Sequence, residues 1–290
     1  MEQFAPWKSY ENAELDRQYS PSIRVESLDA YLEDYARLSA DARSDCRAKL
    51  GLSFSGTPGD RLDYFPASSQ KAPLVLFIHG GNWQALSRAE SAFVAQAVRL
   101  AGAAYAAIDY GLAPHTQLES MVGAIRRCLG WLIDHADSLG HSAERIHIAG
   151  SSAGAHLAAM AVLTSESFQD SIAGCVLMSG IYDLEPIRHT YVNHALGLDA
   201  IRARALSPIH HLRSSVPPVV IACGENETEE YRRQHHAMVG SLQSRGGHVW
   251  DVIELQRNHF DLPYDLVSER SRLGRAVLRQ IHGYATSTEA

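Results

Sequence analysis

Cysteine is scarce in this chain. Its four cysteines, Cys46, Cys128, Cys175 and Cys223, lie far apart in 290 residues. The absence of a CxxC pair or dense cysteine spacing argues against a disulfide framework and favours free, mostly buried thiols. A chain of this length can bury roughly three quarters of the surface that it exposes when unfolded, so it needs no such cross-links.

Basic stripes and long apolar runs are also missing. The chain has 26 Lys and Arg against 33 Asp and Glu, a net charge of −7, and its arginines are scattered. This distribution predicts no nucleic-acid partner. No apolar run approaches the ~20 residues that cross a membrane, and the polar first twenty residues are unlike a signal peptide. We therefore expect a cytoplasmic protein that binds neither nucleic acid nor membranes.

Short apolar runs alternate with amphipathic helices along most of the chain. Near-continuous apolarity is typical of strands that helices cover on both faces, so we expect a mostly parallel central sheet with helices on both faces. No GxGxxG follows the first strand, which argues against a dinucleotide-binding protein. The expected strands are 74–78, 103–108, 146–149, 175–178, 219–223 and 249–255, and the expected helices are 117–139, 153–163, 229–244 and 262–284.

We expect residues 1–290 to form a single domain. Two segments outside this alternation are expected to form a small cap on it. Residues 1–60 are polar, with helical apolar spacing around Ser27 to Ser44. Residues 181–216 contain two prolines and little periodicity, which indicates an insertion between two strands of a core at 61–290.

The strongest local motif is Gly150-Ser151-Ser152-Ala153-Gly154, between an expected strand and an apolar helix. A GxSxG sequence in this position predicts a nucleophile elbow, whose tight turn exposes the serine hydroxyl and needs small residues on either side. The alternative is a glycine-rich turn that binds a phosphate or nothing. The strand-to-helix position favours Ser152 as a catalytic nucleophile.

A second glycine-rich turn, His79-Gly80-Gly81-Asn82-Trp83, directly follows the expected strand 74–78. Adjacent glycines let the backbone come close to a ligand. The N–H groups of Gly80, Gly81 and Ala153 are therefore expected to form an oxyanion hole. We expect His79 to fix the loop by hydrogen bonding, and we consider Trp83 either a packing residue or a pocket wall.

His259 is the expected general base among fifteen histidines. In the fold that carries such an elbow, the histidine comes from the loop after the last strand, and His259 alone occupies that loop. The pairs His210-His211 and His235-His236 lack further metal ligands at useful spacing, so we expect them at the surface or in the cap, with no metal bound.

The acid that orients this histidine is expected after the strand 219–223. Four glutamates follow that strand, and two of them suit the first turn of the next helix, where acids favour the helix dipole. Glu225 and Glu227 remain as candidates. Asp183 is a third option, although its position before Pro186 also suits a turn cap.

Several segments resemble the arylformamidase (kynurenine formamidase) family of α/β-hydrolases, near the hormone-sensitive-lipase-like esterases. The stretch HGGNW at 79–83 is similar to the family's HGGxW, and the other similar segments cover nearly the whole chain. They are Gln18–Ser22 (QYSPS), Asp109–Pro114 (DYGLAP, where the related esterases carry DYRLAP), Ser179–Pro186 (SGIYDLEP), Tyr191–Leu198 and Glu230–Gln234 (EYRRQ, family EFxRQ).

The resemblance implies specific chemistry. It implies an α/β-hydrolase fold and, three residues after Gly224, the acid Glu227, where the family often has aspartate. It also implies hydrolysis of an aryl formamide such as N-formylkynurenine in tryptophan catabolism, with Trp83 and Tyr191 contacting the substrate. We expect a small-molecule substrate, no cofactor, and a homodimer as one option. The rival functions are a short-acyl carboxylesterase and a catalytically inactive receptor or scaffold.

Overall fold

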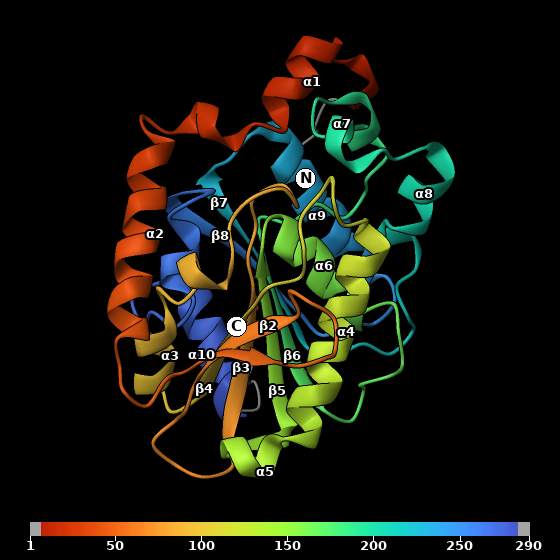
Figure 1. Ribbon diagram of the computed structural model, residues 1–290. Helices are drawn as coiled ribbons and strands as arrows, with labels where there is room; N and C mark the ends of the chain where they lie inside the picture. The colour runs from red at the N-terminus through yellow and green to blue at the C-terminus, as the bar shows by residue number, and fades with distance from the viewer. Residues whose placement is uncertain (1–6, 284–290) are drawn as a thin grey trace.

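An eight-stranded sheet forms the centre of the computed structural model, which describes residues 7–283 (Figure 1). The strand order is β1-β2-β4-β3-β5-β6-β7-β8. The pairs β1/β2 and β2/β4 are antiparallel, and all other neighbours are parallel. The strands are β1 (Lys49–Ser53), β2 (Arg61–Phe65), β3 (Ala72–Ile78), β4 (Ala104–Ile108), β5 (His141–Ser151), β6 (Ile172–Met178), β7 (Val219–Asn226) and β8 (Val249–Asn258).

Helices lie on both faces of this sheet. The α-helices are α1 (Asn12–Gln18), α2 (Leu28–Arg43), α3 (Ala95–Leu100), α4 (Leu118–Asp134), α5 (Ala136–Leu139), α6 (Ala153–Val162), α7 (Asn193–Leu196), α8 (Ala200–Ala205), α9 (Glu229–Gln243) and α10 (Arg272–His282). Short 3₁₀ turns are η1 (Trp7–Ser9), η2 (Pro21–Arg24), η3 (Arg88–Glu90), η4 (Pro186–His189), η5 (Pro208–His210) and η6 (Leu262–Asp265). Among the described residues, no helix has both the length and the apolarity needed to cross a bilayer.

The alternation of side chains along each strand divides the core into two layers. In β3, Leu74, Leu76 and Ile78 pack into the layer under α4, α6 and α9, whereas Val75 and Phe77 pack into the layer under α3 and α10. The sequence runs are apolar throughout because both faces are buried. The six predicted strands are confirmed as β3 to β8, while the antiparallel edge strand β1 and its neighbour β2 were not predicted.

Two helix predictions are wrong in part. The helix expected at 117–139 is interrupted at His135, where α4 ends and α5 begins. The helix expected at 262–284 begins only at Arg272, because the Ser271 hydroxyl caps it by accepting a hydrogen bond of 2.9 Å from Gly274 N–H. Pro263 lies instead in the separate turn η6, and residue 284 lies outside the described part of the chain.

The N-terminal segment and the 181–216 insertion meet at the end of the sheet where the parallel strands terminate (Figure 1). The insertion lies between β6 and β7 as predicted, and contains η4, α7, α8 and η5. Tyr191 N–H donates 2.7 Å to Asp16 Oδ1, and Trp7 stacks on His189 with 5.4 Å between ring centroids. The helix expected around Ser27 to Ser44 is confirmed as α2. The polar N-terminal segment also contributes β1, which joins the sheet edge.

Candidate active site

Ser152 stands on the sharp turn between β5 and α6. Its backbone has φ 57° and ψ −121°, a region that non-glycine residues rarely occupy. The Ser152 N–H donates 2.8 Å to Met178 O in the next strand, which holds the turn against the sheet. This is the strained strand-to-helix geometry of a nucleophile elbow.

The glycines on either side of Ser152 are required by space. A Cβ on Gly150 would lie 2.3 Å from Gly154 O, and a Cβ on Gly154 would lie 2.0 Å from Ile78 O. Both distances are far shorter than any real contact of this kind. Small residues therefore permit the turn, as the GxSxG pattern predicts.

The loop after β3 lies directly against this elbow. A Cβ on Gly80 would meet Ser152 Cβ at 3.1 Å, and Gly81 has φ 88°. Among residues 7–283, the N–H groups of Gly80 and Gly81 have no hydrogen-bond partner. Ala153 N–H, at the first position of α6, has none within its helix. Free donors on two adjoining turns are what a developing oxyanion requires.

His79 fixes this loop, as expected. Its Nδ1 lies 3.0 Å from Gly80 O and 3.1 Å from the hydroxyl of Tyr110, whose ring stacks on it at 4.3 Å. Tyr110 also donates to His79 O at 3.0 Å. Burial lowers the pKa of His79 to about 4, so the ring is neutral near pH 7.

A buried carboxylate lies behind the His259 imidazole. Glu227 Oε2 lies 3.0 Å from His259 Nδ1, and both side chains are almost completely buried. Ser179 Oγ donates a hydrogen bond to the other oxygen, Oε1. Because a carboxylate only accepts, Nδ1 carries a proton and Nε2 is left with its lone pair for a nucleophile.

The rival acids do not reach His259. Glu225 is exposed, and its Oε2 accepts a hydrogen bond of 2.9 Å from Gln256 N–H. Asp183 accepts 3.0 Å from Glu185 N–H and so caps its own turn. The structure therefore brings only Glu227 of the three candidates to the imidazole.

Tyr231 packs against the base, and the sequence analysis did not name this residue. Its ring packs edge-on against His259 with 4.6 Å between centroids. Its buried hydroxyl approaches the Ser152 side chain without completing a hydrogen bond of normal geometry. Burial raises the pKa of Tyr231, and the Ser152 hydroxyl opposes that rise.

The relay from Ser152 to His259 is open in this structure. No hydrogen bond between their side chains is formed among the described residues, although Tyr231 contacts both and both line one cavity. Catalytic hydrogen bonds are often long before substrate binds. Rotation about the single χ1 bond of Ser152 moves its hydroxyl.

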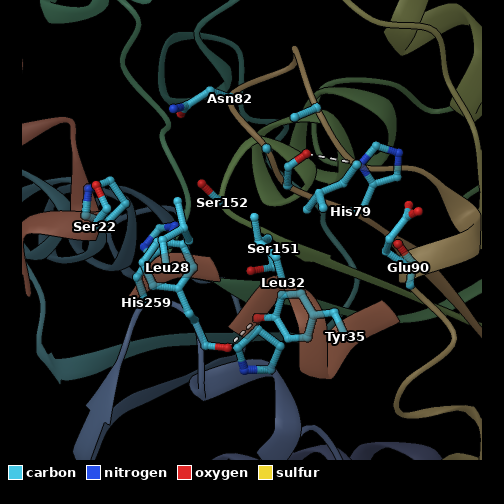
Figure 2. A pocket seen from close by; sticks show the side chains of 18 of the residues that line it. Ser22, Leu28, Leu32, Tyr35, His79, Asn82, Glu90, Ser151, Ser152 and His259 are labelled. Carbon is cyan, nitrogen blue, oxygen red and sulfur yellow. Dashed lines mark hydrogen bonds between the residues drawn. The ribbon is translucent and has the colours of Figure 1, made fainter. Parts of the chain in front are cut away.

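A cavity of about 270 Å³ lies in front of Ser152 and His259 (Figure 2). Apolar and aromatic side chains from α2, β3, the loop between β3 and η3, the segment after η3, and the chain from the end of β8 into η6 form its interior. They are Leu28, Leu32, Tyr35, Phe77, Leu86, Phe93, Phe260 and Pro263. Polar groups of Ser20, Ser22, Asn82, Glu90 and Tyr191 also line it. Such a pocket suits a small, largely apolar ligand.

Two predicted substrate contacts lie in different places. Tyr191 lines the cavity, is 42% exposed, and accepts a hydrogen bond of 3.2 Å from Ser20 Oγ. Trp83 does not line it: the side chain is fully buried, and its Nε1 donates 3.2 Å to His156 Nδ1. The expectation that Trp83 contacts substrate is therefore wrong, and the ring instead ties the oxyanion loop to α6.

The histidine pairs lie outside this cavity. His235 is buried rather than at the surface, and its Nε2 lies 2.7 Å from Asp251 Oδ1. Ligand atoms of His235, His236 and Asp251 lie within 4.8 Å of one another, so the expectation that this pair has no third potential ligand is wrong. Because His235 Nδ1 is buried without a partner among the described residues, His235 lacks the outer hydrogen bond usual for a metal-bound imidazole.

The chain is similar over nearly its whole length to known kynurenine formamidases. The chain is 34% identical over 95% of its length to the kynurenine formamidase of Danio rerio and 32% identical over 95% to that of Salmo salar, covering 98% of each relative. The chain belongs to the kynurenine formamidase family. The BD-FAE family model matches residues 62–242.

Solved structures agree on the fold. A putative thioesterase from Silicibacter sp. TM1040 superposes with a TM-score of 0.82 at 25% identity, over 91% of this chain and 98% of that one. Together with the sheet order and the elbow, this confirms the α/β-hydrolase fold, and the family relatives confirm a hydrolase enzyme.

The family-like segments at the N-terminus and in α9 bind one another in this chain. Tyr19 donates 2.7 Å to Glu230 Oε2 and accepts 2.9 Å from Gln234 Nε2. Gln234 Oε1 in turn accepts hydrogen bonds from the N–H groups of Tyr182 and Asp183, both at 2.9 Å. The QYSPS, EYRRQ and SGIYDLEP segments thus form one buried network behind the active site.

Proposed function

We propose that this protein hydrolyses an aryl formamide such as N-formylkynurenine to the arylamine and formate. The observation that carries the proposal is the buried Glu227–His259 pair, at 3.0 Å, facing the same cavity as the strained Ser152. The named activity of the fish relatives supports the substrate class. A place in tryptophan catabolism is part of the proposal. A cytoplasmic location is too, supported by four free cysteines.

Ser152 and His259 act in the first step. His259 Nε2 takes the Ser152 proton as Oγ attacks the formyl carbon, and Glu227 stabilises the imidazolium that forms. The N–H groups of Gly80, Gly81 and Ala153 donate to the oxyanion of the tetrahedral intermediate. Each such donor typically contributes about 2.7–4 kcal/mol.

Collapse of that intermediate breaks the C–N bond. His259 gives its proton to the departing aniline nitrogen, which leaves a formyl ester on Ser152. Water, deprotonated by His259, then attacks the formyl-serine and releases formate, and the proton returns to Ser152 Oγ.

The cavity suits a substrate with a small formyl group and a large aryl leaving group. A formyl group carries only hydrogen on its carbonyl carbon, so it needs almost no acyl pocket. The aromatic interior around Tyr35 and Phe93, whose rings stack at 4.4 Å, is then available to the aryl leaving group.

A comparison of kcat/KM for N-formylkynurenine and p-nitrophenyl acetate tests this proposal. We expect a clear preference for the formamide and no turnover of either substrate by Ser152→Ala. A clear preference for the acetate would favour the short-acyl carboxylesterase instead. Failure of a fluorophosphonate to label Ser152 would favour an inactive receptor or scaffold.

A further inference from the structure

Glu90 is the only acidic side chain among the described residues that line the active-site cavity, and no Lys or Arg lines it. It lies on the cavity wall near His79 in Figure 2. One carboxylate oxygen, Oε2, accepts 2.6 Å from Ser87 Oγ. Within residues 7–283, Glu90 forms no ion pair, because neighbouring Arg88 binds Asp63 and Asp109 instead.

The groups around Glu90 do not neutralise its charge. His79 is electrically neutral near pH 7, because burial lowers its pKa to about 4. The nearby walls contributed by Phe77, Phe93 and Tyr35 are aromatic. A carboxylate without a cation at an apolar wall carries a desolvation cost. A ligand cation would remove that cost, and aromatic faces favour cations as well.

We propose that Glu90 is a specificity-determining residue that binds an ammonium group on the leaving-group side of the substrate. This inference rests on the proposed function, because N-formylkynurenine carries an α-ammonium group on the side chain of its aryl ring.

Glu90 also belongs to a local turn, and the test must separate the two roles. Ser87 Oγ accepts 3.0 Å from Ala89 N–H and donates to Glu90 Oε2, so the Ser87 hydroxyl links the carboxylate to the start of η3. Glu90→Gln keeps an oxygen that can accept the Ser87 hydrogen bond but removes the charge. Glu144→Gln removes the same charge from an exposed position that does not line the cavity, and serves as the matched control.

Isothermal calorimetry with two ketones that the enzyme cannot hydrolyse measures how much the ammonium group contributes to binding affinity. One is 3-amino-1-(2-aminophenyl)propan-1-one, which carries the ammonium, and the other is 1-(2-aminophenyl)propan-1-one, which lacks it. We expect the wild-type protein and Glu144→Gln to bind the ammonium ketone at least about ten-fold more tightly, a free-energy difference of about 1.4 kcal/mol. In Glu90→Gln the ratio of the two Kd values should fall toward one, with an unchanged Tm.

The proposal is overturned if Glu90→Gln keeps the wild-type Kd ratio, if Glu144→Gln loses it equally, or if neither ketone binds the wild-type protein. Failure of the proposed function has a different signature, namely no turnover of N-formylkynurenine with the charge selectivity intact. Where N-formylkynurenine is turned over, Glu90→Gln should raise its KM at least ten-fold and change kcat much less.

Discussion

Glu227→Gln is expected to lower kcat by about four orders of magnitude, the loss typical when the acid of such a triad becomes an amide. The structure gives the reason. Ser179 Oγ donates to Glu227 Oε1, so the amide oxygen of a glutamine would take that place. The amide NH₂ would then face His259 Nδ1 and force the proton onto Nε2, where it blocks proton transfer from Ser152. Four orders of magnitude correspond to about 5.4 kcal/mol of transition-state stabilisation.

Two further variants sharpen this prediction. Glu225→Gln is the matched control. Within residues 7–283, the exposed Glu225 side chain bonds only to the backbone N–H of Gln256, so this variant should retain near-normal kcat. Glu227→Asp shortens the side chain by one C–C bond, about 1.5 Å. An oxygen that lies 3.0 Å from Nδ1 would then exceed hydrogen-bond distance unless the backbone moves. We expect an intermediate loss of about 10²-fold.

Steady-state kcat with N-formylkynurenine, and with p-nitrophenyl acetate as a second substrate, is the assay, alongside a thermal melt to confirm folding. The reasoning is refuted if Glu225→Gln is the damaging change, or if folded Glu227→Gln retains more than a tenth of the wild-type kcat.

Three other substitutions test the surroundings of the site. Tyr231→Phe removes a buried hydroxyl without a normal partner, so the free energy of unfolding should stay the same or rise by about 1 kcal/mol. If that hydroxyl positions Ser152, kcat should fall severalfold. An unchanged kcat would contradict such a positioning role. Trp83→Phe loses the hydrogen bond to His156, so chemical denaturation should show a free energy of unfolding lower by about 1–3 kcal/mol, with little change in KM. A large change in KM without a loss of stability would instead show that Trp83 contacts the substrate. Gly154→Ala places a methyl 2.0 Å from a strand carbonyl, so soluble, active protein should be lost, and normal activity would show that the elbow tolerates a side chain.

The parts of the site that depend on local backbone geometry could be predicted from the sequence. Gly150 and Gly154 are forced by the space around the turn, and two glycines after β3 leave the N–H groups of Gly80 and Gly81 free. The apolar runs predicted β3 to β8, because a strand that helices cover on both faces needs apolar side chains at nearly every position.

Predictions failed where a distant partner decides the outcome. β1 lies at the edge of the sheet and is partly exposed, so it lacks the continuous apolar run of a strand that is buried on both faces. β2 joins the sheet only through its antiparallel pairing with β1 and β4. The start of α10 depends on the Ser271 cap and on Leu273 N–H, which donates 2.8 Å to Glu254 Oε2 of β8. Trp83 was assigned to the pocket because its neighbours belong there, but its partner is His156, 73 residues away.

The sequence by itself determined the elbow, the oxyanion loop, the parallel core and the position of His259, since each is encoded within a few adjacent residues. Only the tertiary structure decided between Glu225 and Glu227, packed Tyr231 against His259, and made Glu90 the one acidic side chain among the described residues of the cavity. The physical reason is that the direction of a side chain at the end of a strand depends on the elements packed against it. No local pattern records those contacts.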